Sequence, residues 1–182
     1  MSRFSVVGTS GAGKTQLASA IADRLDIPHV ELDALYHQPD WGEPAPEAFR
    51  ADVIEALAGD AWVACGNYSA VRPTVWGRAT HVVWLDYPRG VVMRRVVRRT
   101  VRRVVRREQL WNGNREPWRN LWDPRPRHNI IVWSWTNHEK YRRRYASAMD
   151  DRTWAHLSFV QLRSPAEAEA WIADLVPDRP VG

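Results

Sequence analysis

The sequence predicts an α/β protein whose parallel sheet is covered by helices on both faces. Short apolar runs alternate along the chain with segments of helical apolar spacing, an order typical of parallel sheets with crossover helices. A glycine-rich segment joins the first apolar run to the first helical segment, where anion-binding loops are common. The chain has 182 residues, enough for one domain with its own core. We expect that domain to span residues 1–176.

Five segments are expected to be strands because they are short, apolar and bounded by turn residues. They cover residues 3–7, 28–32, 61–65, 81–85 and 156–162. Helices are expected at 16–25, 47–57, 89–110, 129–149 and 165–175. Ser164 is a suitable N-cap for the last helix, with Pro165 at its first position. The segment 33–46 is polar and rich in proline, 111–127 is expected to be an irregular loop, and 177–182 is expected to be a flexible tail.

The glycine-rich segment has the spacing of a phosphate-binding loop, G-x-x-x-x-G-K-[ST], which runs from Gly8 to Thr15. Its glycines let backbone N–H groups turn toward the phosphates, Lys14 reaches the terminal phosphates, and the Thr15 hydroxyl can ligate Mg²⁺. A glycine-rich turn without a nucleotide is the alternative. The candidate nucleotide contacts are Gly8, Thr9, Ser10, Gly11, Ala12, Gly13, Lys14, Thr15 and Gln16.

Paired arginines recur every four residues in the helix expected at 89–110. The pairs are Arg94-Arg95, Arg98-Arg99, Arg102-Arg103 and Arg106-Arg107, with apolar residues or Thr100 between them. Each pair lags the previous one by about 40° around a helix, so the arginines form a slowly winding stripe. Like charges this close repel one another. The stripe therefore indicates an anionic partner, either substrate phosphates or nucleic acid, unless acidic neighbours pair with it.

A segment rich in Asn, Gly and Trp follows the arginine helix, and we expect a lid at about residues 108–127. Asn112, Gly113 and Asn114 mark a sharp turn in it. Arg115 is placed to close over a transferring phosphoryl group, or else to be an exposed loop arginine.

Composition narrows the class of protein further. The net charge is +5, and 24 of the 26 basic residues are arginines, the lysines being Lys14 and Lys140. Arginine suits phosphate because it can bind through two parallel hydrogen bonds. The single cysteine, Cys65, excludes an internal disulfide. With no apolar run of membrane-spanning length and no room for a signal peptide before the first strand, we expect a soluble cytoplasmic protein without a membrane partner.

Several short motifs together resemble one group of proteins. They are the phosphate-binding loop, Leu32-Asp33 after the second strand, Gly66-Asn67-Tyr68 after the third, Leu85-Asp86-Tyr87-Pro88 after the fourth, and Trp111-Asn112-Gly113-Asn114-Arg115-Glu116. The pattern covers about residues 1–162. It is similar to small bacterial P-loop proteins known as adenylate-kinase-related or "topology modulation" proteins. Their wider relatives are nucleoside-monophosphate, shikimate and gluconate kinases.

The resemblance implies a three-layer P-loop NTPase fold with a five-stranded parallel sheet and an arginine-bearing lid. It implies that Lys14 and Thr15 hold ATP and Mg²⁺, and that an acceptor binds at about residues 33–60. Asp33 would face the acceptor and contribute to the metal site. The remaining acceptor-side residues that it suggests are Arg50, Gly66, Asn67, Tyr68 and Arg72, and Arg107 and Arg115 would act from the lid.

One position departs from the pattern of the related kinases. They usually carry an aspartate at the end of the third strand, where it holds Mg²⁺-bound water, and this chain has Cys65 there. A neutral thiol is a poor ligand for Mg²⁺. Either Asp33 takes over through water, or metal affinity and turnover are weak.

The sequence supports two classes of function. The first is a kinase that transfers the γ-phosphoryl group of Mg-ATP to a small acceptor, expected to be a nucleotide as in adenylate kinases. With a hydroxyl acceptor, Asp33 would be the base or orienting group. The second is a nucleic-acid-associated ATP-binding protein that uses the arginine stripe, although no nucleic-acid motif is present. A nucleotide binder without turnover is a further alternative.

Overall fold

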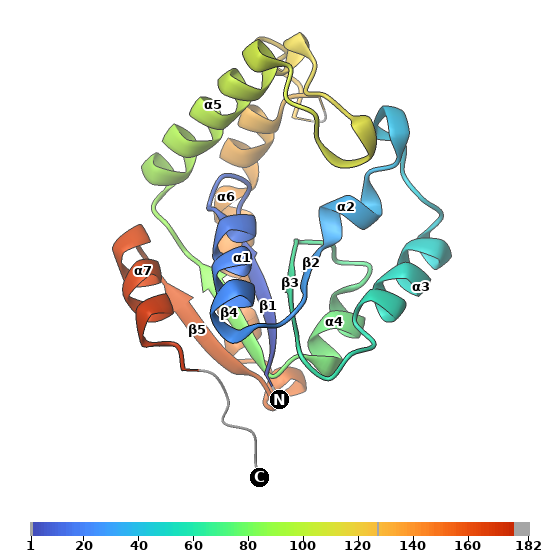
Figure 1. Cartoon of the computed structure of the whole chain (residues 1–182). Helices are drawn as coiled ribbons and strands as arrows, with labels where there is room; N and C mark the ends of the chain where they lie inside the picture. The colour runs from blue at the N-terminus through green and yellow to red at the C-terminus, as the bar shows by residue number, and fades with distance from the viewer. Residues whose placement is uncertain (1, 127, 177–182) are drawn as a thin grey trace.

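All five strands of the sheet are parallel, in the order β2-β3-β1-β4-β5 (Figure 1). The strands are β1 (Arg3–Gly8), β2 (His29–Glu31), β3 (Trp62–Cys65), β4 (His81–Leu85) and β5 (Ser158–Leu162). The computed structural model describes residues 2–126 and 128–176. The expected α/β fold with a five-stranded parallel sheet is confirmed. Residue 127 of the expected lid and the expected tail at 177–182 lie outside the described residues.

Strand register brings several chain segments to the carboxyl edge of the sheet. On β1, Val6 is paired with Cys65 and Gly8 with Leu85, while Glu31 at the end of β2 is also paired with Cys65. Parallel strands end at the same edge, where ligands of such sheets usually bind. The phosphate-binding loop, Glu31 and the segment after Cys65 are therefore neighbours.

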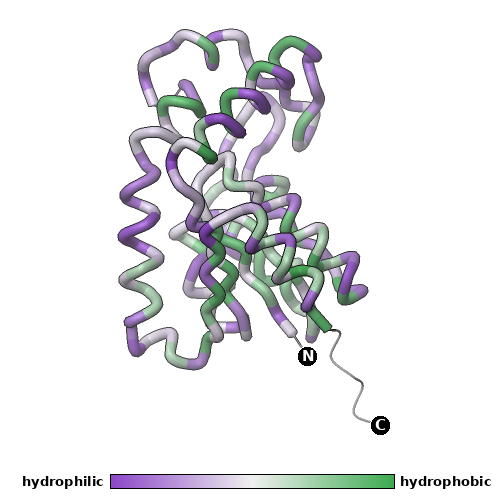
Figure 2. The backbone as a smooth tube through the Cα atoms, turned by 90° about the vertical axis from the view of Figure 1, so that its left-hand side faces the viewer, coloured by the Kyte–Doolittle hydropathy of each residue, from purple (hydrophilic) through white to green (hydrophobic). Residues whose placement is uncertain are grey.

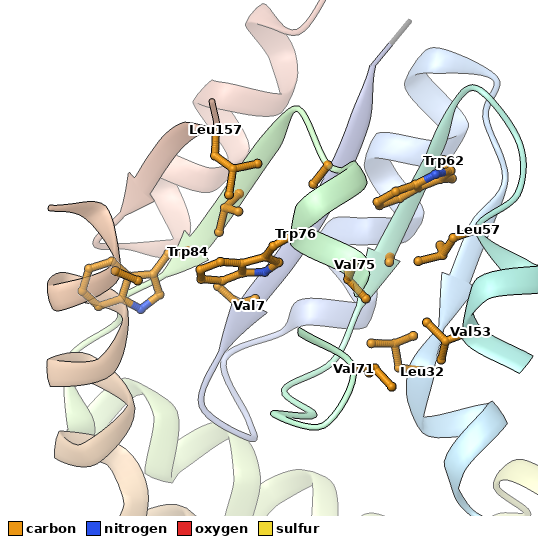
Figure 3. Close-up of a cluster of buried hydrophobic side chains, with 14 of the residues drawn as sticks. Val7, Leu32, Val53, Leu57, Trp62, Val71, Val75, Trp76, Trp84 and Leu157 are labelled. Atoms are coloured by element: carbon orange, nitrogen blue, oxygen red, sulfur yellow. The ribbon is translucent and has the colours of Figure 1, made fainter. Parts of the chain in front are cut away.

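Helices cover both faces of the sheet and bury two apolar layers. One layer is formed with α1 (Lys14–Leu25) and α7 (Pro165–Asp174), the other with α3 (Pro46–Ala56), α4 (Arg72–Arg78) and α6 (Ile130–Met149). Figure 3 shows the second layer around Trp76, which is 1% exposed and donates its indole N–H to the Ser5 hydroxyl. Figure 2 shows green, hydrophobic segments gathered in the central part of the molecule, as expected when both faces of a sheet are buried.

The arginine-rich helix α5 (Arg89–Arg106) packs along α6, and the chain then crosses toward α2 (Leu32–Tyr36) (Figure 1). This crossing contains two short 3-10 helices, η2 (Trp111–Gly113) and η3 (Trp118–Leu121). The expected helix at 89–110 is too long, because Arg107 adopts a left-handed conformation (φ 51°) and ends α5. None of the helices in the described residues is long and apolar enough to cross a membrane.

Short helices are where the sequence-based expectations were wrong. No helix is predicted in the segment 33–46, but it contains most of α2 and the 3-10 helix η1 (Pro39–Trp41). Helix α4 was not expected at all. It forms because Pro73 suits a first helical turn and because Val75 and Trp76 are buried against the sheet. Such tertiary burial outweighs weak local helix signals.

We expect Gly11→Ala to lower the free energy of unfolding by about 2–4 kcal/mol. Gly11 has φ +90°, and a Cβ there would lie 2.8 Å from Val96 Cβ and 2.9 Å from the Val92 carbonyl oxygen. The control is Gly90→Ala on α5, where a Cβ meets nothing within 4 Å, so stability should rise by about 0.5–1 kcal/mol. Urea unfolding measures both. Equal stabilities for the two variants would show that Gly11 is not in tight contact with α5.

Candidate active site

The phosphate-binding loop adopts a conformation that depends on glycine at three positions. Gly8, Gly11 and Gly13 have φ values of 147°, 90° and 102°, which residues with a Cβ rarely adopt. Gly13 is the N-cap of α1, so the loop ends at the N-terminus of a 12-residue helix. Backbone N–H groups and the helix dipole both favour an anion at this place.

Neighbouring elements hold the loop through its carbonyl oxygens. Asn67 Nδ2 donates to the Gly8 oxygen at 2.6 Å, and Arg95 Nη1 donates to the Ala12 oxygen at 3.1 Å. The Ser134 hydroxyl of α6 donates to the Ser10 oxygen at 2.7 Å. Because these bonds come from three different elements, the loop is shaped before any nucleotide arrives.

Two half-buried cations, Lys14 and Arg99, lie beside the loop. Lys14 Nζ lies 3.4 Å from the Thr9 oxygen, and burial lowers the pKa of Lys14 while the charge of Asp33 opposes that shift. Arg99 Nη2 donates to the Ser10 hydroxyl at 3.1 Å, and its buried Nε has no hydrogen-bond partner. Burial, followed by the nearby charge of Arg103, lowers the pKa of Arg99 to about 10. Half-buried, incompletely paired cations beside a glycine-rich loop fit the phosphates of a nucleotide.

The arginine stripe divides into an inner and an outer half. Arg95 and Arg99 bond to the loop, and Arg103 Nη1 donates to Glu116 Oε1 at 3.1 Å. The outer arginines are exposed: Arg94, Arg98, Arg102, Arg106 and Arg107. The arginines at every fourth position, Arg95, Arg99 and Arg103, therefore face the phosphate-binding loop and the lid. The sequence could not reveal this, because the register of the helix was not known.

Glu31 stands beside the expected metal position. The Thr15 hydroxyl donates to Glu31 Oε1 at 2.7 Å, and Cys65 Sγ lies 3.9 Å from the same hydroxyl. Burial, followed by the Glu31 charge, raises the pKa of Cys65 to about 12, so the thiol is neutral. Mg²⁺ prefers oxygen ligands, and Thr15 and Glu31 provide them. The carboxylate missing at Cys65 is thus present on the adjacent strand.

Asp33 lies toward the acceptor segment rather than toward Thr15. Its Oδ1 accepts a hydrogen bond from the Tyr68 hydroxyl at 2.6 Å. Burial and the charge of Asp33 both raise the pKa of Tyr68, which keeps its proton on the hydroxyl. The carboxylate in direct contact with Thr15 belongs to Glu31, and the expectation that Asp33 serves the metal through water stays a prediction. The acceptor-side role of Asp33 stays a prediction.

The other expected acceptor residues have different surroundings. Gly66, Asn67, Tyr68 and Arg72 line one cavity, together with Arg144 and Tyr145. The Asn67 amide is used by the loop and by Tyr145, whose hydroxyl donates to Asn67 Oδ1 at 2.9 Å, so Asn67 is first a loop-holding residue. Arg50 is exposed on α3. Their contacts with an acceptor stay predictions.

The lid is docked on the segment after β2. Asn112 Nδ2 donates to the His37 oxygen at 2.6 Å, and Asn114 Oδ1 accepts from the Trp41 backbone N–H at 2.8 Å. Arg115 is exposed, and its backbone oxygen accepts from the Trp41 indole at 3.1 Å. Arg107 caps α5 with an exposed side chain. Among the described residues no polar side-chain bond is seen for Arg107 or Arg115, so their action from the lid stays a prediction.

Sequence reasoning missed Glu31 and did not separate Arg95 and Arg99 from their exposed partners. A signal for Glu31 was available: it is an acidic residue at the carboxyl end of a strand, two residues before Asp33. Its closeness to Thr15 follows only from the pairing of β2 with β3.

We expect Lys14→Ala to weaken nucleotide binding about a hundredfold, because it removes the half-buried ammonium beside the phosphate-binding loop. Lys140→Ala is the matched control, since it removes the same charge from an exposed position on α6. Calorimetric titration with ATP measures both. Equal affinities for the two variants would contradict the nucleotide assignment of the loop.

Arg99→Gln is expected to lower nucleotide affinity about tenfold without lowering the stability of the free protein. The reason is that Arg99 is half-buried beside other cations and bonds to the loop. The preceding residue, Arg98, is exposed, and its replacement by Gln should change affinity by less than about twofold. Nucleotide titration and thermal unfolding of both variants check this. A parallel loss of stability and affinity in Arg99→Gln would instead identify a purely structural arginine.

Comparison with known proteins agrees with this geometry. The family model described as shikimate kinase matches residues 10–125, which include most of the phosphate-binding loop, Glu31, Asp33 and the lid. A search of curated proteins gave no match. A gluconokinase from Sinorhizobium meliloti 1021 is a solved structure with a similar fold, at 20% identity over 94% of this chain and 91% of that chain, with a TM-score of 0.51.

A shikimate kinase from Acinetobacter baumannii, solved in complex with shikimate, is 18% identical over 93% of this chain and 88% of that chain, with a TM-score of 0.52. At these identities the two structures show a common fold. The expected relationship to P-loop kinases is confirmed, whereas the finer resemblance to adenylate-kinase-related proteins is not supported. Because the family match covers more than half of the sequence, the chain belongs to the shikimate kinase family of P-loop kinases.

Proposed function

We propose that this protein is a phosphotransferase that uses Mg-ATP to phosphorylate a hydroxyl group of a small acceptor. The observation that carries the proposal is the separation of two carboxylates at the carboxyl edge of the sheet. Glu31 is bonded to Thr15 of the phosphate-binding loop, and Asp33 is bonded to Tyr68 on the acceptor side. One carboxylate is thereby available to a metal and the other to an attacking group.

The position of each side chain in the site supports one role in phosphoryl transfer. The loop backbone, Lys14 and Arg99 bind and neutralise phosphate charge, while Thr15 and Glu31 provide oxygen ligands for Mg²⁺. When bound, Mg-ATP supplies the phosphoryl group and the charge of the metal. Asp33 orients an acceptor hydroxyl and accepts its proton, with Tyr68 fixing the carboxylate. The docked lid covers the edge of the site, which favours transfer to the acceptor over loss to water.

The acceptor is therefore proposed to be a hydroxyl compound rather than the nucleotide expected from the sequence. Arg50 is exposed on α3, whereas Arg72 and Arg144 line the cavity beside Tyr68, and such arginines suit the carboxylate of a hydroxy acid as well as a phosphate. The family match also supports a small-molecule kinase. Shikimate and gluconate, named for the similar structures, are the first acceptors to test.

Nucleic-acid association has less support once the arginine stripe is divided. Its inner half bonds to the phosphate-binding loop and to Glu116, so only the exposed half is left for another polyanion. The decisive assay is ADP release from Mg-ATP with shikimate, gluconate, each nucleoside monophosphate and DNA in turn. Strong stimulation by a hydroxyl compound supports the proposal, and stimulation only by a nucleoside monophosphate or by DNA contradicts it.

Asp33→Asn should lower turnover with the stimulating acceptor about a hundredfold or more, since the amide cannot accept the hydroxyl proton. ATP affinity should change by less than about threefold, because Asp33 is not bonded to the loop. The control is Asp52→Asn, an exposed aspartate on α3. Steady-state kinetics and ATP titration separate the two effects. Unchanged turnover in Asp33→Asn would remove Asp33 from the reaction.

A further inference from the structure

The first residue of the lid helix η2 reaches the metal side of the site. The Trp111 indole Nε1 donates to Glu31 Oε2 at 2.7 Å, while Glu31 Oε1 accepts from Thr15 at 2.7 Å. We propose that Trp111 is a positioning residue that holds Glu31 against the metal side of the site and so couples lid closure to metal binding. This inference rests on the proposed function, because it assigns a partner to the metal-side carboxylate of that same site.

The indole is fixed by contacts on both of its sides. The His37 ring stacks on Trp111 with centroids 5.4 Å apart and an interplanar angle of 26°. The Arg103 guanidinium lies 5.9 Å from the centroid of the indole, and Arg103 is itself bonded to Glu116 of the lid. A ring held in this way presents its single N–H donor in one direction. The direction it takes is toward Glu31.

The position of Trp111 depends on lid docking. Asn112 and Asn114, one and three residues after Trp111, bond to backbone groups of His37, Gln38 and Trp41. If these bonds open, η2 leaves the segment after β2 and takes the indole with it. Glu31 then keeps Thr15 as its partner but loses its second one.

A carboxylate with one fixed oxygen can rotate its other oxygen away from a metal, and a second hydrogen bond prevents this. Hydrogen bonds to metal-ligating carboxylates raise metal affinity, and their loss typically costs tenfold or more. Glu31 needs such support because it ends β2, a strand of three residues at the edge of the sheet. Trp111 supplies it only when the lid is docked.

The test compares Trp111→Phe with Trp122→Phe. The first change keeps an aromatic ring for His37 and Arg103 but removes the N–H, and the second alters an exposed tryptophan in the same segment. Mn²⁺ binding in the presence of a non-hydrolysable ATP analogue is followed by electron paramagnetic resonance. We expect about tenfold weaker Mn²⁺ binding in Trp111→Phe alone, with metal-free nucleotide affinity unchanged. Trypsin cleavage after Arg115 or Arg119 should also become faster.

A double-variant cycle with Glu31→Gln identifies the route of the effect. If Trp111 acts through Glu31, adding Trp111→Phe to Glu31→Gln changes Mn²⁺ affinity little further. Independent, additive effects overturn the inference, and so does equal Mn²⁺ affinity in Trp111→Phe and Trp122→Phe. A wild-type protein that binds Mn²⁺ with the analogue but phosphorylates no acceptor leaves this inference supported and contradicts the proposed function alone. Absence of metal-dependent nucleotide binding in the wild type overturns both.

Discussion

The seating of the phosphate-binding loop against α5 is the constraint on which the site depends. Gly11 approaches the Val92 carbonyl and Val96 so closely that no side chain fits between them. This contact sets the depth of the loop and the register of α5 at the same time. With that register fixed, Arg95 and Arg99 reach the loop and Arg103 reaches the lid. A close backbone approach thus decides which half of the arginine stripe is functional.

The arginines of α5 repel one another, and several hydrogen-bond and ion-pair partners offset part of this repulsion. Arg95 bonds to the loop, Arg103 bonds to Glu116, and Arg102 pairs with Glu108 at 2.9 Å. Arg99 remains the least compensated, because its Nε is buried without a partner. Phosphate groups would complete this arrangement, so part of the binding free energy comes from relieving repulsion that the free protein carries.

Much of this fold could be predicted from the sequence, because strand runs and the loop spacing are local signals. The same spacing puts Lys14 and Thr15 at the start of α1, and their roles with ATP and Mg²⁺ stay predictions. Glu31 was missed since its role depends on pairing with Cys65 across two strands 34 positions apart in the chain. Helix α4 was missed because its burial against the sheet, and not its local sequence, stabilises it. The register of α5 likewise follows from the Gly11 contact, which no periodicity reveals.

The buried thiol of Cys65, beside Thr15, can be used to measure local opening of the site. Cys65 is the single cysteine, it is 2% exposed, and its pKa is raised to about 12. In the folded state the reactive thiolate is therefore both scarce and shielded. Alkylation can proceed only when the carboxyl edge of the sheet opens, so the labelling rate measures local opening beside Thr15 of the phosphate-binding loop. A ligand that closes the site would slow the same reaction, so the alkylation rate of Cys65 would also report ligand binding.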